Sequence, residues 1–116
     1  EVMNIIGDVR DKNLIILDDM IDTAGTLCNA AEALKKYREK NIYACCTHPV
    51  LSGPAIERIQ NSELTEVIVL DTIPLPEEKR IEKIKILSTA PLFASAIEKI
   101  FDCESVSVLF SPEPQK

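Results

Sequence analysis

Residues 13–27 read Asn13-Leu14-Ile15-Ile16-Leu17-Asp18-Asp19-Met20-Ile21-Asp22-Thr23-Ala24-Gly25-Thr26-Leu27. Leu14 to Leu17 form a continuous apolar run, which is typical of a parallel strand covered on both faces. Three carboxylates follow within five residues, and the small residues after them indicate a tight turn into a helix. The stretch therefore predicts a buried strand, an acidic turn and the start of a helix, in that order.

The predicted turn has the chemistry of a site for a ribose phosphate. Thr23 to Thr26 would leave backbone N–H groups unpaired at a helix N-terminus, where the helix dipole also favours an anion. The carboxylates would repel a phosphate, so we expect them to face hydroxyl groups or a divalent metal ion. The simpler alternative is that Asp19 and Asp22 cap turns and Thr26 caps the helix. Three carboxylates around a small-residue loop favour binding.

Composition narrows the class of protein. A chain of 116 residues is one domain, and its net charge of −6 argues against nucleic-acid binding, which needs a basic face. No apolar run approaches membrane-spanning length and no signal peptide is visible, so we expect no membrane contact and a cytoplasmic protein. The cysteines have no CxxC spacing and are predicted to be buried free thiols, with the adjacent pair on opposite faces of a strand: Cys28, Cys45, Cys46 and Cys103.

Strands alternate with helices along the rest of the chain. The pattern predicts a short strand over 1–6, a helix over 27–39, a strand over 42–47, a helix over 54–61, a strand within 64–70, an exposed loop over 71–80, a strand over 84–87, a helix over 91–101, a last short strand over 106–110 and an unstructured tail. This order predicts an α/β fold with a mostly parallel sheet, flanking helices and right-handed crossovers.

In such sheets ligands bind at the carboxyl ends of the strands. Three predicted turns follow strand ends and should therefore meet at one edge of the sheet: residues 18–26, 47–53 and 71–73. The single histidine, His48, lies in the second of these turns. It could contact substrate or water there, but we favour the simpler interpretation of an ordinary turn histidine.

Two acidic residues followed by Asp-Thr-x-Gly-Thr resemble the phosphoribosyl pyrophosphate binding motif of type I phosphoribosyltransferases and phosphoribosyl pyrophosphate synthetases. Further segments resemble ribose-phosphate pyrophosphokinases in the same order: residues 47–59, 71–74, 94–97 and 104–110. The resemblance covers residues 2–110 and implies the C-terminal half of that enzyme, as one domain with a type I phosphoribosyltransferase-like fold. The missing initiator Met agrees with a fragment.

The resemblance implies transfer of diphosphate from ATP to C1 of ribose 5-phosphate, with Mg²⁺, to give phosphoribosyl pyrophosphate. It implies that the 5-phosphate is held by Asp22, Thr23, Ala24, Gly25 and Thr26. It implies that Asp18 and Asp19 meet the ribose hydroxyls or a metal bound to them. The family's catalytic Lys and Arg should precede Glu1, and its residues for ATP and metal lie in the other half. We therefore expect no catalytic residue here and no activity from this chain alone.

Ser105, Ser107 and Phe110 match a segment that, in regulated members of the family, helps to form an allosteric site for ADP or phosphate between subunits of a hexamer. A simple edge strand is the alternative, because Val106 and Val108 alternate as a strand requires. Two other functions stay open. A salvage phosphoribosyltransferase would use the same loop but needs a base-recognition hood, and a non-catalytic synthetase-like regulator would have lost catalytic positions.

Overall fold

The structure is a computed structural model that describes residues 7–37 and 40–110. Its four strands form one parallel sheet in the order of the sequence: β1 (Asn13–Ile21), β2 (Asn41–Pro49), β3 (Glu66–Leu70) and β4 (Ile84–Leu87). The helices are α1 (Gly25–Lys35), α2 (Ala55–Gln60) and α3 (Ala90–Phe101), with 3₁₀ turns η1 (Glu77–Lys79) and η2 (Val106–Phe110). The predicted strand over 1–6 and the predicted tail lie outside the described residues.

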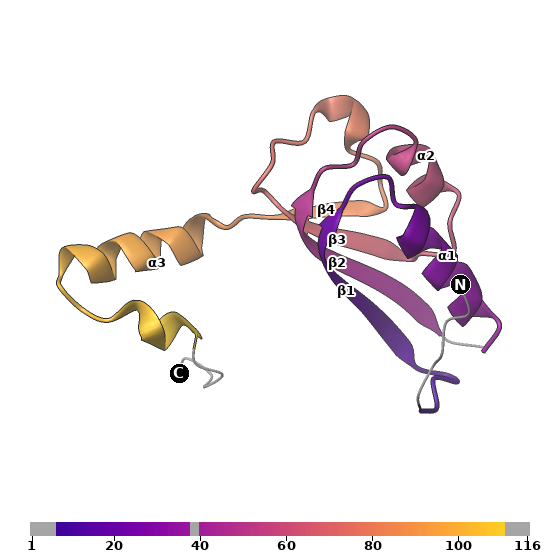
Figure 1. Ribbon diagram of the computed structural model, residues 1–116, viewed down its shortest axis with the longest axis horizontal. Coiled ribbons are helices and arrows are strands. Elements are labelled where there is room, and N and C mark those ends of the chain that lie inside the picture. Colours follow the sequence, from indigo (N-terminus) through magenta and orange to yellow (C-terminus); the bar gives the residue numbers. More distant parts are fainter. Residues whose placement is uncertain (1–6, 38–39, 111–116) are drawn as a thin grey trace.

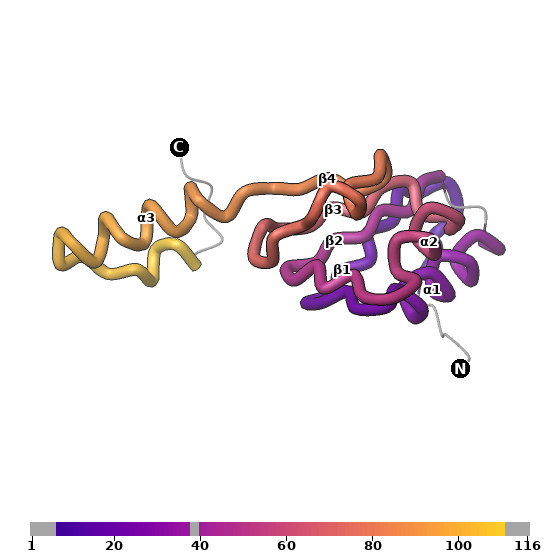
Figure 2. Tube along the Cα trace, turned by 90° about the horizontal axis from the view of Figure 1, so that it is seen from above, coloured from indigo at the N-terminus to yellow at the C-terminus, as the bar shows by residue number. Residues whose placement is uncertain are grey.

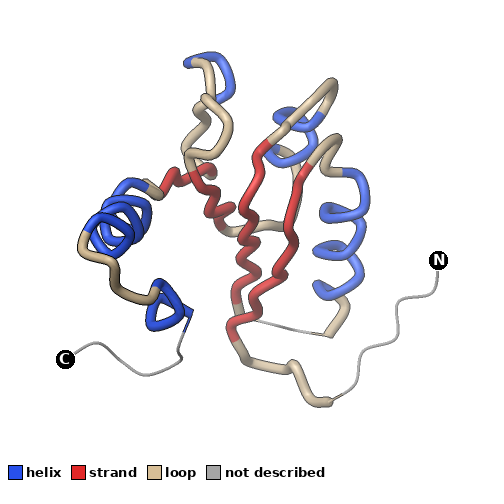
Figure 3. The backbone as a smooth tube through the Cα atoms, turned by 60° about the vertical axis from the view of Figure 1, so that its left-hand side comes forward, coloured by secondary structure: helices blue, strands red, loops and turns tan. Residues whose placement is uncertain are grey.

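The layers follow from the strand order. Each crossover between parallel neighbours is right-handed, so successive crossovers in one direction place their helices on the same face of the sheet. Figure 3 shows α1 and α2 side by side on one face, as this rule requires. The predicted α/β fold with a parallel sheet and flanking helices is confirmed.

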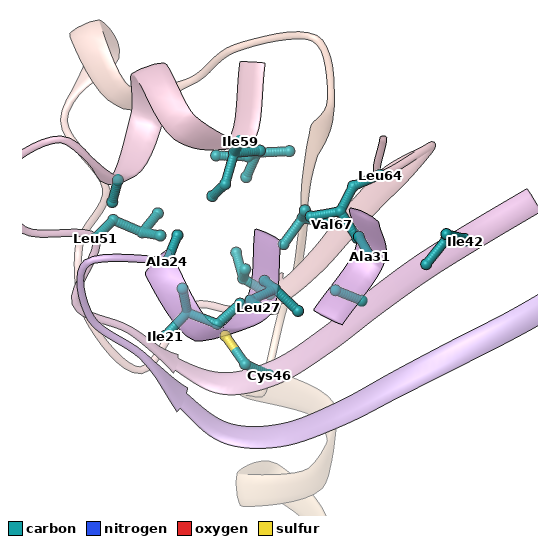
Figure 4. Close-up of a cluster of buried hydrophobic side chains, with 14 of the residues drawn as sticks. Ile21, Ala24, Leu27, Ala31, Ile42, Cys46, Leu51, Ile59, Leu64 and Val67 are labelled. Atoms are coloured by element: carbon teal, nitrogen blue, oxygen red, sulfur yellow. The ribbon is translucent and has the colours of Figure 1, made fainter. Parts of the chain in front are cut away.

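The core lies between this face and the two helices (Figure 4). Strand residues that point to this face are almost fully buried: Ile42, Ala44, Val67 and Val69. Leu27 and Ala31 from α1 and Ile59 from α2 close the cluster. Burying such side chains stabilises a fold by roughly 1.5–3 kcal/mol each relative to exposure.

The other face of the sheet is uncovered among the described residues. Ile15 is 67% exposed and Leu17 is 81% exposed, although both belong to the apolar run of β1. Successive side chains of a strand point to opposite faces, and α1 and α2 cover only one. The prediction that Leu14 to Leu17 is covered on both faces is therefore wrong for the part of the chain that the structure describes.

Helix α3 stands apart from the sheet, as Figures 1 and 2 show. The radius of gyration is 17.0 Å, against about 13 Å for a compact domain of this length. The apolar stripe predicted for this helix is present but exposed, with Leu92 at 56% and Ile97 at 67%. Within the described residues, no helix is both long enough and apolar enough to cross a membrane.

The predicted last strand over 106–110 is wrong, because these residues form the 3₁₀ turn η2. The Ser105 hydroxyl accepts a hydrogen bond from the backbone N–H of Ser107 at 3.2 Å, which favours a turn over an extended chain. The segment lies beside α3 and away from the sheet, so it has no strand to pair with (Figure 1).

The loop after β3 is only partly the exposed projection that we expected. Leu75 is 5% exposed and belongs to the core. The Lys79 ammonium donates to the Leu51 carbonyl oxygen at 2.9 Å, and the Arg80 guanidinium donates to the Leu75 carbonyl oxygen at 2.8 Å. Lys79 thus holds the loop against the turn after β2, while the hydrogen bond of Arg80 lies within the loop.

The four cysteines are free, as predicted. Cys46 is buried and Cys45 half-buried, which agrees with their expected placement on opposite faces of β2. Burial raises the pKa of the Cys46 thiol to about 11, so this thiol stays protonated at neutral pH. Cys28 is half-buried like Cys45, and Cys103 is exposed, so the prediction of buried thiols is confirmed for Cys46 alone.

Asp71 holds Thr89, the residue directly before α3, and this contact should weaken at low pH. Its carboxylate accepts hydrogen bonds from the Thr89 hydroxyl at 2.7 Å and the Thr89 backbone N–H at 2.8 Å. These bonds, the hydroxyl first, lower the pKa of Asp71 below its ordinary value of 3.8. A lowered pKa means that the stabilisation is complete above the ordinary value and is lost as the pH falls through the folded one.

We therefore expect amide hydrogen exchange at Thr89 to be faster in Asp71→Asn than in the unmodified chain at about pH 6, since a neutral amide oxygen is a weaker acceptor than a carboxylate. The difference should shrink, after correction for intrinsic exchange, once the pH falls below the ordinary value of 3.8 and Asp71 protonates. NMR exchange measurements over this range check it. Equal protection of Thr89 in both proteins at about pH 6 would show that Asp71 does not hold Thr89.

Candidate functional site

The turn from β1 to α1 encloses a hollow of about 200 Å³ at the carboxyl end of the sheet. It is lined by Asp18, Met20, Ile21, Asp22, Thr23, Ala24, Gly25, Thr26 and Leu27. Helix α1 begins at Gly25, two residues earlier than predicted, and β1 continues to Ile21 through the first two carboxylates. The turn itself is therefore only Asp22 to Ala24.

The N-terminus of α1 opens onto this hollow. Ala24 is the N-cap residue, and no side chain caps the helix. Thr26 lies inside the first turn, so the alternative in which it caps the helix is wrong. The first backbone bond of the helix runs from Cys28 N–H to the Ala24 carbonyl at 3.0 Å. Donors of the first turn therefore remain for an anion, which the helix dipole also favours.

Ala24 fixes the shape of the turn. Its φ of 59° is left-handed, a conformation that costs a residue with a side chain roughly 1 kcal/mol or more. Its side chain is 5% exposed and points into the core beside Ile21 and Leu27 (Figure 4). The back of the turn is thus anchored in the core, while the front faces the hollow.

The three carboxylates do not share one surface. Asp18 lines the hollow, and its carboxylate accepts the backbone N–H of Asp19 at 2.9 Å. The side chain of Asp19 falls on the opposite face of β1, because neighbours in a strand alternate. The Asp22 carboxylate accepts a hydrogen bond from the Ser52 hydroxyl.

The three predicted turns do meet at this edge of the sheet. Leu51 N–H donates to the Ile21 carbonyl and Ser52 N–H to the Asp22 carbonyl, each at 3.0 Å. The turn after β2 therefore continues the hydrogen bonding of β1.

The third turn joins through a histidine. The ring nitrogen Nδ1 of His48 lies 2.9 Å from the Thr72 hydroxyl, which donates to the Thr47 carbonyl at 2.9 Å. Since the hydroxyl proton is engaged with Thr47, the imidazole is the donor, so its proton is on Nδ1. His48 thus ties the second turn to the third.

Arg58, on α2, contacts the turn between β1 and α1, and the sequence did not predict this contact. Its guanidinium nitrogen Nη1 donates to the Thr23 carbonyl oxygen at 3.0 Å. The same nitrogen would lie 3.2 Å from a Cβ placed on Gly25, so the guanidinium packs directly on this glycine. The only signal in the sequence was its place in a segment that carries the resemblance. The contact between Ser52 and Asp22 was not predicted either, because Ser52 also had no signal beyond its place in that segment.

A larger hollow of about 710 Å³ lies between α1 and α2. Its wall carries the carboxylates Glu32, Glu57 and Glu63 and one guanidinium, from Arg58. Three carboxylates against one cation disfavour a phosphate, since like charges repel. The smaller hollow is lined by two carboxylates, Asp18 and Asp22, and by no cation, so charge does not favour an anion there either. It is the uncapped end of α1, with its backbone N–H donors, that suits an anion in this hollow.

The other expected site residues lie elsewhere. Ser107 and Phe110 belong to η2 and Ser105 directly precedes it, beside α3 and away from the turn between β1 and α1 (Figure 1). The Ser105 and Ser107 hydroxyls are 2.7 Å apart, and Phe110 is 82% exposed. In residues 7–37 and 40–110, no group of three or more His, Cys, Asp or Glu side chains is placed to hold a metal ion.

Comparisons with known proteins show what this chain is similar to. The chain is 60% identical over 113 residues to a ribose-phosphate pyrophosphokinase of Clostridium acetobutylicum, covering 97% of this chain and 35% of that protein. It is 63% identical over 111 residues to one of Caldanaerobacter subterraneus, with 96% and 35% covered. The chain thus spans about a third of the length of these relatives.

The fold has a solved relative as well. A phosphoribosylpyrophosphate synthetase from Mycobacterium smegmatis superimposes with a TM-score of 0.79 at 42% identity, covering 84% of this chain and 33% of that one. Residues 1–111 match the family described as phosphoribosyl synthetase-associated domain. The chain therefore belongs to the phosphoribosyl synthetase-associated domain family.

Proposed function

We propose that this chain is the C-terminal half of a ribose-phosphate pyrophosphokinase, and that it supplies the binding site for ribose 5-phosphate. The observation that carries the proposal is the hollow at the end of β1, where an uncapped helix N-terminus stands next to a carboxylate. An anion suits the first and a hydroxyl group suits the second. A ribose 5-phosphate presents both.

The phosphate end of the ligand is assigned to the turn and the first turn of α1. Backbone N–H groups of Asp22 to Thr26 and the hydroxyls of Thr23 and Thr26 are its donors. Gly25 has no side chain, which lets the phosphate approach the helix end closely. Charge-assisted hydrogen bonds of this kind contribute roughly 1.5–3 kcal/mol each.

The sugar end is assigned to the carboxylates. Asp18 lines the same hollow as the turn, so a ligand held at its phosphate would bring its hydroxyls toward Asp18. Asp19 lies on the opposite face of β1 and would reach the sugar only through a metal ion or through a change in the strand. Binding at both ends fixes where the C1 hydroxyl points, which is the main requirement of phosphoryl transfer.

The reaction of the complete enzyme is transfer of diphosphate from ATP. The C1 oxygen of ribose 5-phosphate bonds to the β-phosphorus, the bond from that phosphorus to the α-phosphate oxygen breaks, and AMP leaves while the hydroxyl proton is released. We assign the catalytic Lys and Arg and the ATP contacts to the other half of the enzyme. This chain alone would bind and orient ribose 5-phosphate without turning it over.

Magnesium belongs to the complete enzyme in this proposal. The described part of the chain does not provide a full set of ligands, because it contains no cluster of three potential metal-binding side chains. Asp18 and Asp22 both line the hollow, and each could contribute an oxygen, although Asp22 already accepts a hydrogen bond from Ser52. Mg²⁺ bound with ATP would neutralise the charge of the phosphates.

The exposed apolar surfaces support association with further polypeptide. The uncovered face of the sheet and the stripe on α3 expose several large apolar side chains, among them Leu17 and Ile97, as surfaces that bind other polypeptides do. We propose that the complete enzyme is a cytoplasmic homo-oligomer, a hexamer as the resemblance implies. An allosteric site for ADP or phosphate at Ser105, Ser107 and Phe110 is part of the same proposal.

Calorimetric titration tests the site at both ends. We expect the chain to bind ribose 5-phosphate saturably and inorganic phosphate more weakly. Asp18→Ala should weaken ribose 5-phosphate binding about tenfold, since one charged hydrogen bond to the sugar is lost. The same variant should bind inorganic phosphate at least as well, because it has lost a repelling charge.

Asp102→Ala, which removes a carboxylate after α3, serves as the control and should leave both affinities unchanged. Failure of the unmodified chain to bind ribose 5-phosphate at millimolar concentration would contradict the proposal. Equal losses for the two ligands in Asp18→Ala would contradict the assignment of Asp18 to the sugar.

A further inference from the structure

We propose that Arg58 is a positioning residue that presets the phosphate-binding turn by fixing the peptide plane between Thr23 and Ala24. The inference rests on the proposed function for its ligand, but its geometry rests on the structure alone. The contact joins a side chain of α2 to the main chain of a turn that lies 35 residues earlier in the sequence.

The planarity of the peptide bond fixes the direction of the Ala24 N–H. The Arg58 guanidinium donates from Nη1 to the Thr23 carbonyl oxygen at 3.0 Å, so this carbonyl points toward α2. In a trans peptide the C=O and the following N–H point in opposite directions, and the described residues contain no cis peptide bond. The Ala24 N–H therefore points away from α2. The 200 Å³ hollow is lined by this turn and by no residue of α2, and we infer that the Ala24 N–H faces it.

The strained backbone of Ala24 needs support from its surroundings. Ala24 is left-handed, and such residues persist only where their surroundings over-determine them. On one side the Ala24 methyl is buried in the core. On the other side Arg58 holds the carbonyl that precedes it. Without the guanidinium, rotation of the Thr23–Ala24 peptide would relieve the strain and turn an anion donor away from the hollow.

The charge of Arg58 acts in the same direction. Among residues 7–37 and 40–110, no carboxylate forms an ion pair with this guanidinium. Its positive charge lies against Gly25, the first residue of α1, and adds to the positive end of the helix dipole. Arg58 therefore favours an anion in the hollow without lining it.

The experiment compares Arg58→Met with Lys83→Met. Lys83 is a matched control, because its ammonium also donates to main-chain carbonyls, those of Ser62 at 2.8 Å and Ile59 at 3.4 Å, but at the far end of α2. Both variants remove one cation that holds main-chain carbonyls. Ribose 5-phosphate affinity is measured by calorimetry, the thermal midpoint by circular dichroism, and the Ala24 φ angle by its three-bond HN–Hα coupling.

We expect Arg58→Met to lower the affinity at least about tenfold, as loss of one charge-assisted donor requires. The Ala24 coupling should change, and Arg58→Lys should recover part of both effects. Lys83→Met should lower the thermal midpoint without moving the affinity or the coupling. An unchanged Ala24 coupling in Arg58→Met would overturn the proposal even if the unmodified chain bound no ribose 5-phosphate. A changed coupling with no binding by the unmodified chain would instead contradict the proposed function.

Discussion

Replacing Gly25 by valine is expected to lower the affinity for ribose 5-phosphate at least about a hundredfold, because two or more charge-assisted hydrogen bonds of roughly 1.5–3 kcal/mol each would be lost. A Cβ at this position already lies 3.2 Å from Nη1 of Arg58. The branched side chain of valine would displace the guanidinium from the Thr23 carbonyl. It would also crowd the Thr23 hydroxyl, which is assigned to the phosphate and whose Oγ1 would lie 3.9 Å from such a Cβ.

Stability should respond much less than binding. The atom that would be displaced is the end of a flexible side chain, which can move at low cost. Valine also forms helices slightly better than glycine. We therefore expect the thermal midpoint to stay close to that of the unmodified chain while binding disappears, a combination that places the effect at the site.

Calorimetric titration with ribose 5-phosphate measures this effect. Gly25→Ala should fall between the unmodified chain and the valine variant, because its single methyl asks Arg58 to shift by only a few tenths of an ångström. Asn29→Val places the same side chain one turn further along α1, outside the 200 Å³ hollow, and should bind normally. Near-normal binding by Gly25→Val would mean that phosphate does not approach this end of the helix.

Most elements could be predicted because each has a local cause. The apolar run before Asp18 specified β1, Pro54 marked the start of α2 within one residue, and the stripe around Ile97 specified α3. The meeting of three turns at one edge followed from parallel topology alone. The hydrogen bond between His48 and Thr72 is one consequence of that topology.

What covers each face could not be predicted in the same way. A continuous apolar run such as Leu14 to Leu17 indicates two covered faces, but it does not say which polypeptide covers them. The segment after Ser105 shows a different limit. Alternating valines suit a strand only where a neighbouring strand is available, and η2 has none within the described residues.

The most informative contact of the site had no sequence signal of its own. Arg58 donates to a main-chain carbonyl, and every residue type offers the same acceptor. The identity of residue 23 therefore does not indicate that Arg58 binds its carbonyl. Two side chains of opposite charge can be recognised in a sequence as a possible ion pair. A contact between a side chain and the main chain can be recognised only in the structure.

Leu51→Ala should have the largest effect on stability. Leu51 is fully buried, so its truncation is expected to lower the free energy of unfolding by about 3 kcal/mol, within the range of 2–5 for buried leucines. Its φ of 48° is left-handed, but alanine keeps the Cβ and hence the same backbone strain. The loss therefore measures packing alone.

Leu51→Ala should also lower the affinity for ribose 5-phosphate. Leu51 N–H donates to the Ile21 carbonyl, and the next residue, Ser52, holds Asp22. The side chain of Leu51 is what anchors this turn in the core, as its place in Figure 4 shows. Loosening the turn should therefore reduce ribose 5-phosphate affinity under conditions where the chain is still folded.

Urea unfolding followed by circular dichroism measures the change, with an unchanged slope showing that only stability has shifted. Leu17→Ala is the control, because it makes the same substitution at a side chain that is 81% exposed, and it should cost less than about 0.5 kcal/mol. Similar losses at the two positions would mean that Leu17 is covered in solution. A loss below about 1 kcal/mol at Leu51 would mean that the turn after β2 is not anchored by its side chain.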